Sequence, residues 1–151
     1  MATTVAGSRA PGLPRGLVVG HTRAVRVLIA DDSATARAQA RYALDAARAP
    51  VVVRDDEPVV VEADGGVEAL RQIVSGAVDL LTSELHMPRV HGLDVLSFRR
   101  TRMGPTGRAV VVTIGMSAVA RARATADGAV AFCDKPLSPE GLVAALASMG
   151  R

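Results

Sequence analysis

The chain has 151 residues, of which 49 % are apolar and 22 % are charged, the size and composition of one soluble globular domain. No apolar run approaches the roughly 20 residues needed to cross a bilayer, so the sequence excludes a membrane-spanning protein. One cysteine, Cys133, excludes an intramolecular disulfide and fits a reducing, cytoplasmic compartment. Because Cys133 lies within an apolar strand pattern, we expect it to be buried and inert.

The net charge of +3 and the pI of about 10.0 suggest an anionic partner such as nucleic acid. Residues 1–23, however, contain three arginines and no acidic residue, whereas residues 24–151 contain fifteen basic and fifteen acidic residues. The first segment is rich in Gly, Pro, Ala and Thr and has no helical or strand period, so we expect a disordered tail over 1–23 and one domain over 24–150. Because that domain is neutral and poor in aromatic residues, we expect no direct binding of nucleic acid.

Apolar strand patterns alternate with helical patterns from residue 25 onward. The expected strands are 25–30, 59–63, 79–84, 109–114 and 129–132, and the expected helices are 34–47, 66–74, 92–100, 117–126 and 138–149, the last with Ser138 as N-cap. This alternation predicts an α/β fold, a doubly wound parallel sheet of five βα units with helices on both faces, in three layers. Residues 48–58 are expected to form a surface insertion, with a short strand or a partner-docking segment as alternatives.

Polar residues stand at the carboxyl ends of these strands, the edge at which open parallel sheets bind ligands. The first strand ends at Asp31 and Asp32, the third at Glu84, the fourth at Thr113 and the fifth at Lys135. Clustered carboxylates favour a hard cation, and Mg²⁺ is held by one or two carboxylates together with phosphate oxygens. A hydroxyl and an ammonium can both contact an anionic oxygen. The five side chains therefore predict a Mg²⁺ and phosphoryl site.

The motifs around these residues resemble the receiver domains of two-component response regulators. The similarity covers residues 25–149, and each motif is weak alone but specific in this order and at these strand ends. The matching segments are Val-Leu-Ile-Ala-Asp-Asp-Ser at 27–33, Asp-Leu-Leu-Thr-Ser-Glu-Leu-His-Met-Pro-Arg-Val-His-Gly-Leu at 79–93, Val-Val-Val-Thr at 110–113 and Gly-Ala-Val-Ala-Phe-Cys-Asp-Lys-Pro at 128–136. The resemblance implies a flavodoxin-like receiver fold with strand order 2-1-3-4-5 and Mg²⁺ as cofactor.

The resemblance also implies roles for the matching residues. Asp31 and Asp32 match the acidic pair that holds Mg²⁺, and His86 stands where the family uses a backbone carbonyl as a metal ligand. Thr113 matches the hydroxyl residue that contacts the phosphoryl group, and Lys135 matches the lysine that pairs with it.

A switch role is implied for two residues. Phe132 matches the aromatic residue whose rotamer reports the state of the site to a partner-binding face, and Thr113 is the site residue coupled to it. The partners implied are a histidine kinase or another signalling protein, and we expect a monomer or a weak homodimer.

Glu84 departs from the family pattern, which has Asp as the phosphate acceptor at this position. One additional methylene moves the carboxylate by roughly 1.3–1.5 Å, and a misplacement of about 1 Å can slow in-line phosphoryl transfer about a hundredfold. The longer side chain can instead occupy part of the phosphoryl space and pair with Lys135 and Thr113. Ile114 is a second departure, since the family usually has a small residue there, and we expect it to crowd the site.

Two functions follow from these departures. The first is a stand-alone, atypical receiver that signals by protein–protein contact without normal phosphorylation, because Glu84 partly mimics the phosphorylated state and weakens or abolishes Mg²⁺ binding. The alternative is a conventional receiver that takes a phosphoryl group from a histidine kinase in a Mg²⁺-dependent way. In neither case do we expect an enzyme beyond residual self-phosphorylation and dephosphorylation.

The remaining polar residues of the central segment have simpler interpretations. His86 and His91 are expected to be loop surface residues, because their spacing resembles no zinc site. Arg99, Arg100 and Arg102 are expected to form a solvated helix face.

Overall fold

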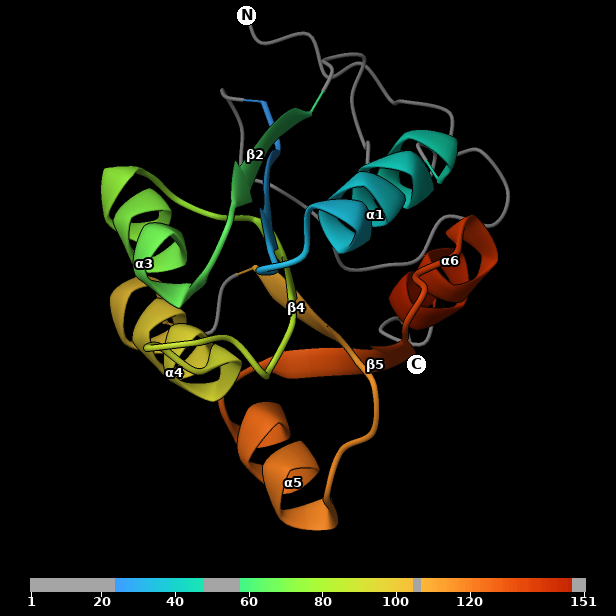
Figure 1. The fold of residues 1–151 in the computed structure, drawn as a ribbon. Coiled ribbons are helices and arrows are strands. Elements are labelled where there is room, and N and C mark those ends of the chain that lie inside the picture. Colours follow the sequence, from blue (N-terminus) through green and yellow to red (C-terminus); the bar gives the residue numbers. More distant parts are fainter. Residues whose placement is uncertain (1–23, 48–57, 105–106, 148–151) are drawn as a thin grey trace, which may run out of the picture.

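A five-stranded parallel sheet forms the centre of the molecule, and the computed structural model describes residues 24–47, 58–104 and 107–147 (Figure 1). The elements are β1 (Arg26–Ala30), α1 (Ala34–Ala46), β2 (Val59–Ala63), α3 (Gly66–Ser75), β3 (Leu80–Ser83), α4 (Gly92–Met103), β4 (Arg108–Thr113), α5 (Ala118–Ala126), β5 (Ala129–Asp134) and α6 (Pro139–Ala147). The expected tail over 1–23 and the expected insertion, apart from its last residue, lie outside the described residues. None of the described helices is long and apolar enough to span a membrane.

The strand order is β2-β1-β3-β4-β5, which confirms the prediction. Every pair is parallel, and β1 lies between β2 and β3 with Leu28 opposite Val61 on one side and Leu81 on the other. The chain therefore crosses over from one side of β1 to the other between β2 and β3. This switch point lies at the carboxyl ends of β1 and β3, where the polar residues were predicted.

Helices cover both faces of the sheet, and successive residues of β1 point to opposite faces. Val27 and Ile29 pack with α1 and α6, whereas Leu28 and Ala30 pack with α3, α4 and α5. Each of these four β1 side chains is no more than 1 % exposed, because a central parallel strand is covered on both sides. The core is aliphatic, as the composition predicts.

Polar caps fix the beginnings of the helices at the carboxyl edge of the sheet. The hydroxyls of Ser33, Ser117 and Ser138 accept hydrogen bonds from Ala36 N, Ala120 N and Gly141 N, which satisfies backbone donors that a helix leaves unpaired. The prediction of Ser138 as N-cap is therefore confirmed.

Helix α4 corrects two of the expectations. It ends at Met103 rather than at residue 100, because Gly104 adopts a φ of 63° at the C-cap. Arg99 is only 2 % exposed and is not part of a solvated face, although Arg100 and Arg102 are exposed. Arg99 lies three and four residues after Leu96 and Val95, which are buried against the sheet, so its helical position directs it inward.

The buried guanidinium of Arg99 donates to the carbonyl of Val78 at 3.2 Å and thereby ties α4 to the residues that precede β3. Burial lowers the pKa of Arg99 to about 10, and the nearby carboxylate of Asp79 opposes this effect. The side chain therefore stays charged at neutral pH.

Candidate functional site

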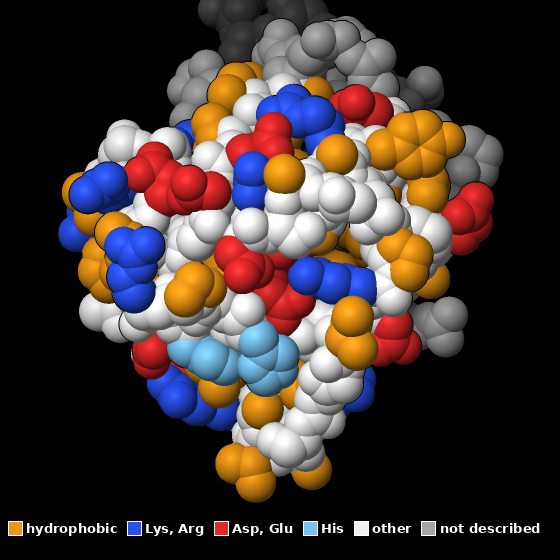
Figure 2. All heavy atoms as spheres, viewed as in Figure 1, with side chains coloured by type: hydrophobic (Ala, Val, Ile, Leu, Met, Phe, Trp, Pro, Cys, Tyr) orange, Lys and Arg blue, Asp and Glu red, His pale blue; other side chains and the backbone are white. Residues whose placement is uncertain are grey.

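The carboxyl ends of β1, β3, β4 and β5 meet at one point of the sheet edge. Backbone hydrogen bonds from Glu84 N to Ala30 O and from Lys135 N to Thr113 O hold these four ends in register. Figure 2 looks onto this edge and shows acidic side chains beside a basic one near the centre of the surface, with the two histidines below them. Four of the five predicted site residues come into contact here: Asp31, Glu84, Thr113 and Lys135.

Glu84 is buried, with 5 % of the residue exposed, and both carboxylate oxygens contact donors of the protein. Oε1 accepts a hydrogen bond from the Thr113 hydroxyl at 2.5 Å and from the backbone N–H groups of Leu85 and His86 at 2.8 and 3.0 Å. Oε2 lies 2.6 Å from Lys135 Nζ. The side chain folds back toward its own loop, so this carboxylate fills a position built for an anionic oxygen.

The ammonium of Lys135 bridges two carboxylates. It lies 2.7 Å from Asp31 Oδ2 as well as 2.6 Å from Glu84 Oε2. Asp31 is held in turn by the backbone N–H of Ser33, which donates to Oδ1 at 2.9 Å. The prediction that Glu84 pairs with Lys135 and Thr113 is thus confirmed in its geometry.

These contacts decide the charge of the site. Burial alone would raise the pKa of Glu84, but the Lys135 ammonium, the Thr113 hydroxyl and the His86 N–H outweigh it and hold that pKa below its ordinary value. Burial lowers the pKa of Lys135, and the carboxylates of Asp31 and Glu84 overcome this and raise it. Both groups are therefore ionised over the neutral range, as a bridged ion pair requires.

Lowering the pH should remove the contribution of Glu84 to stability. Because its folded-state pKa lies below the ordinary value of 4.5, the contribution is complete above pH 4.5 and disappears as the pH falls through the folded-state pKa. We expect Glu84→Gln to cost about 1–3 kcal/mol at neutral pH and progressively less in acid. Urea unfolding of both proteins across this range measures the difference, with Glu140→Gln as the control for loss of one exposed carboxylate. A difference that stays constant down to the acid limit would contradict the ion pair.

Asp32 does not join this cluster. Its side chain is exposed and makes no hydrogen bond or ion pair with another described residue. The physical reason is that it follows Asp31 directly, so its side chain leaves the chain in a different direction from the end of β1.

The donor set does not fit a tightly held Mg²⁺ in this arrangement. All four carboxylate oxygens of Asp31 and Glu84 already accept hydrogen bonds or pair with the ammonium, the partners being Ser33, Thr113, Lys135 and the loop backbone. Among the described residues, no group of three or more His, Cys, Asp or Glu side chains is placed to hold a metal ion. The ammonium of Lys135 lies between the two carboxylates. A metal ion bound by both carboxylates would have to occupy the same place.

The loop between β3 and α4 is packed against the site through Gly92. A Cβ at this position would lie 2.1 Å from the carbonyl oxygen of Glu84 and 2.7 Å from Leu85 Cα, so only glycine permits this approach. Arg89 in the same loop has a φ of 68°, a left-handed conformation that costs energy for a residue other than glycine. The tight loop fixes the backbone N–H groups that face Glu84.

The two histidines of this loop differ in their surroundings. His91 is the N-cap of α4, and its Nδ1 accepts the N–H of Leu93 at 3.2 Å. In the neutral ring the proton then lies on Nε2, so neither nitrogen offers a free lone pair. His86 is exposed, packs edge-on against His91 at 5.5 Å between ring centroids, and contacts the site through its backbone N–H.

Ile114 follows Thr113 at the end of β4 and is not packed into the buried cluster around Glu84. Its side chain is 77 % exposed, whereas Thr113 beside it is 3 % exposed. Whether this exposed side chain crowds an incoming phosphoryl group stays a prediction.

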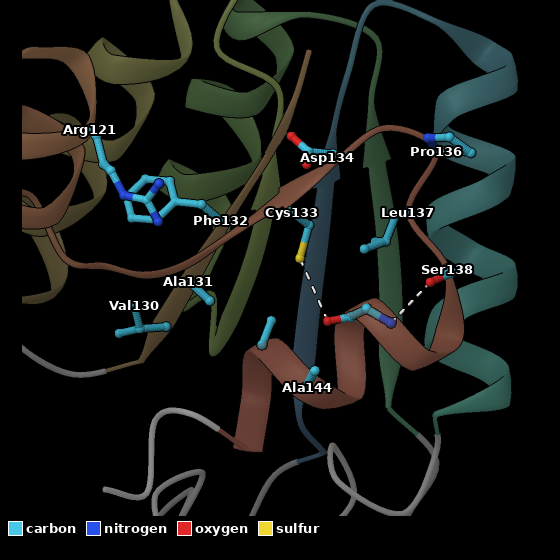
Figure 3. Close-up of a pocket in the computed structure, with 12 residues that line it drawn as sticks. Arg121, Val130, Ala131, Phe132, Cys133, Asp134, Pro136, Leu137, Ser138 and Ala144 are labelled. Atoms are coloured by element: carbon cyan, nitrogen blue, oxygen red, sulfur yellow. Dashed lines mark hydrogen bonds between the residues drawn. The ribbon is translucent and has the colours of Figure 1, made fainter. Parts of the chain in front are cut away.

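Phe132 lies in β5 at the edge of a groove of about 480 Å³ (Figure 3). Its ring is half-buried, and the guanidinium of Arg121 from α5 stacks over it at 4.3 Å from the ring centroid. Cys133 also lines the groove and is half-buried rather than buried as expected, because β5 pairs with β4 alone and its outer side is open. Burial and the neighbouring Asp134 raise the pKa of the Cys133 thiol, so it stays protonated at neutral pH.

Three contacts of this region are absent from the sequence-based prediction. The N–H groups of Leu85 and His86 contact Glu84 through the backbone, for which side-chain identity gives no signal. Arg121 meets Phe132 across two elements, and nothing in the local pattern distinguishes it from the exposed arginine two residues later.

The fold and the site together define a class of protein: a doubly wound α/β domain with an acid, a hydroxyl and a lysine converging at the carboxyl edge of its sheet. The chain belongs to the response regulator receiver domain family, because the model of that family, "Response regulator receiver domain", matches residues 27–147. This confirms the resemblance drawn from the motifs. Receiver domains are signalling domains of two-component systems.

Curated relatives and solved structures agree with this assignment. "Protein-glutamate methylesterase/protein-glutamine glutaminase 4" of Myxococcus xanthus is 36 % identical over 120 residues, which cover 77 % of this chain and 31 % of the relative. A second methylesterase of this kind, from Hahella chejuensis, is 35 % identical over 116 residues, 75 % of this chain and 30 % of that protein. The chain thus spans about a third of the length of the curated relatives it matches, and the similarity lies in their receiver domains.

Two solved structures illustrate the similarity of the fold. The response regulator domain of Thermotoga maritima CheB has a TM-score of 0.64 and 27 % identity, covering 85 % of this chain and 98 % of that one. The receiver domain of the NarL regulator from Mycobacterium tuberculosis has a TM-score of 0.66 and 26 % identity, covering 86 % of this chain and all of the other, 100 %.

Proposed function

We propose that this chain is an atypical receiver in phosphorelay signalling, held in one state by Glu84 and acting by protein–protein contact rather than by accepting a phosphoryl group. The observation that carries this proposal is the saturation of the Glu84 carboxylate. Its two oxygens accept four bonds, from Thr113, Lys135 and two backbone N–H groups. A nucleophilic carboxylate needs a free oxygen facing the phosphodonor, and here the groups that would orient a phosphoryl oxygen are bound to the carboxylate itself.

Glu84 stands at the acceptor position in the chain, but in this interpretation its carboxylate takes the place of the phosphoryl group. Thr113 and Lys135, which the family uses for phosphoryl contacts, meet its carboxylate at 2.5 and 2.6 Å. The replacement is incomplete, because a carboxylate has one negative charge and two oxygens where a phosphoryl group has more of both. Phe132, with Arg121 stacked upon it, is the residue that would report this state at the groove beside β5.

Metal binding follows from the same contacts. Mg²⁺ would have to displace Lys135 from Asp31 or Glu84, and we propose that its affinity is much reduced or lost. When bound in a receiver, Mg²⁺ neutralises the charge of the incoming phosphoryl group. The residues that the family resemblance assigns to the ion are Asp31, Asp32 and the carbonyl of His86, and of these side chains Asp31 is paired with Lys135 while Asp32 lies outside the cluster.

The proposed partners are a histidine kinase or another signalling protein of the cytoplasm, met by a monomer or a weak homodimer. Nucleic acid is not among them, since residues 24–151 carry equal numbers of acidic and basic residues. The methylesterase and glutaminase activities named for the curated relatives belong to longer proteins, of which the match covers less than a third, and are not proposed for this domain.

The test compares the natural protein with Glu84→Asp in the presence of Mg²⁺ and a small phosphodonor such as acetyl phosphate. We expect the natural protein to gain no phosphoryl mass by intact-protein mass spectrometry. Glu84→Asp, with a carboxylate shorter by one methylene, should be labelled at least about a hundredfold faster. Mg²⁺ titration of the two proteins should show tighter binding by the Asp variant.

Glu84→Asp with Lys135→Ala is the matched control, because it restores the acceptor but removes the lysine. Stable labelling of the natural protein at Glu84 would overturn the proposal and support the conventional receiver. Equal Mg²⁺ affinity in the natural protein and in Glu84→Asp would show that Glu84 does not cause weak metal binding.

A further inference from the structure

Four exposed arginines form a basic band across α4 and α5. They are Arg100 and Arg102 of α4, and Arg121 and Arg123 of α5. A step of two residues turns a helix by about 200°, so the two arginines of each helix leave it on nearly opposite sides, one toward the neighbouring helix and one away from it. Figure 2 shows basic side chains gathered at the lower left, over the region of these helices.

The inner two arginines lie where α4 and α5 meet. Arg123 donates from Nη2 to Asp94 Oδ1 at 3.1 Å, which joins the two helices. Nη1 of Arg100 lies 3.6 Å from the position of a Cβ on Gly128, the second residue after α5. The contact with Asp94 shows that Arg123 can bind a carboxylate at this position. An exposed ion pair of this kind contributes little stability, so Arg123 can exchange Asp94 for another carboxylate.

The outer two arginines are each stacked on a phenyl ring. Arg102 lies over Phe98 at 5.9 Å and Arg121 over Phe132 at 4.3 Å from the ring centroid. Contact with a ring restricts each guanidinium group, more closely for Arg121 than for Arg102, which reduces the entropy lost when it binds an anion. Among the described residues, Arg100, Arg102 and Arg121 make no ion pair with a carboxylate.

Acidic and basic residues are unevenly distributed along the domain. Residues 92–127 contain six arginines and two acidic residues, whereas residues 24–91 contain seven arginines and eleven acidic residues. A long polyanion such as nucleic acid would extend beyond the band and be repelled by the acidic residues of 24–91. Both rings of the band are half-buried beneath guanidinium groups, so neither is free to stack on bases. A short acidic segment would contact the band alone.

We infer that the basic band is a docking surface for an acidic segment of a partner protein, with guanidinium–carboxylate pairs to Arg100 and Arg123 at its centre. This deepens the proposed function, since it rests on action by protein contact, and it assigns a surface and a partner chemistry. It does not depend on the state of Glu84. Asp94 occupies part of the surface in the free protein, and the partner's carboxylates replace it.

The experiment measures fluorescence anisotropy of a labelled peptide of alternating Glu and Ser, with an oligothymidine of equal net charge as the competing class of ligand. We expect the peptide to bind, and Arg100→Glu or Arg123→Glu to weaken binding by about fivefold or more each. Asp94→Asn should tighten it, because it frees Arg123. The matched control is Arg71→Glu on α3, an exposed arginine that is also paired with an acidic residue, Glu68.

Circular dichroism establishes that each variant folds, and amide chemical shifts locate the peptide on α4 and α5. No peptide binding, or binding that Arg100→Glu and Arg123→Glu leave unchanged, would overturn the inference. Tighter binding of oligothymidine through the same arginines would also overturn it and assign the band to nucleic acid. Because the readout is peptide affinity, failure here leaves the phosphoryl-mass test of Glu84 unaffected.

Discussion

Replacing Lys135 with Met should destabilise the protein by about 3–5 kcal/mol at neutral pH. The ammonium is the shared cation of Asp31 and Glu84, whose side chains are each 6 % exposed. Without it, two buried carboxylates face each other with no compensating charge, and one of them must take up a proton or move into water. Urea unfolding of the two proteins at neutral pH measures the loss.

The double variant Lys135→Met with Glu84→Gln separates charge from packing. It removes one carboxylate together with the ammonium, so we expect it to recover a large part of the lost stability, a strong departure from additivity. Lys135→Arg keeps the charge but has a planar, bulkier head that cannot replace a compact ammonium between two oxygens, and it should fall between the natural protein and Lys135→Met. A loss below about 1 kcal/mol in Lys135→Met would mean that the bridge is not formed in solution.

Gly92→Ala should cost about 2–3 kcal/mol and also disturb the Glu84 site. The added methyl would approach the Glu84 carbonyl oxygen to 2.1 Å, and that atom belongs to the backbone, so the loop between β3 and α4 must shift as a unit. The shift carries the N–H groups of Leu85 and His86 with it and weakens their bonds to the carboxylate. The measurements are the free energy of unfolding and the amide chemical shifts of these two residues.

Gly65→Ala is the control, since this glycine also lies at the start of a helix, as the N-cap of α3, whereas Gly92 is the first residue of α4. Its φ of 175° is extended backbone that any residue adopts, and no atom lies within 4 Å of an added Cβ. We therefore expect a change within about 1 kcal/mol and no effect at the site. If both variants behaved alike, helix-start propensity rather than close packing at Gly92 would explain the loss.

Much of the architecture could be predicted because it depends on local patterns. Continuous apolar runs such as 27–30 identify buried parallel strands, and the polar residues that end these runs lie at one edge whatever the details of packing. The positions of Asp31, Glu84, Thr113 and Lys135 followed from this rule alone. The motifs then identified the family, and the family model supports that identification over residues 27–147.

The sequence-based predictions were wrong where the direction of a side chain matters more than its position in the chain. Asp32 stands next to a site residue in the chain, yet its exposed side chain does not join the cluster, because neighbouring residues leave the backbone in different directions. Arg99 was grouped with two exposed arginines by sequence adjacency, and its place on the buried side of α4 decided otherwise. Each of these outcomes depends on an angle that residue type does not encode.

From the amino-acid sequence one can predict the parallel sheet, the family and, through the family resemblance, the strand order, together with a glutamate where that family has an aspartate. The tertiary structure decided what the glutamate does. A methylene changes reach by little more than an ångström, and whether that reach ends in water, on a metal or on Lys135 depends on how four strand ends converge. Here they converge so that every oxygen of Asp31 and Glu84 has a donor from the protein, and the lone lysine of the chain lies between them.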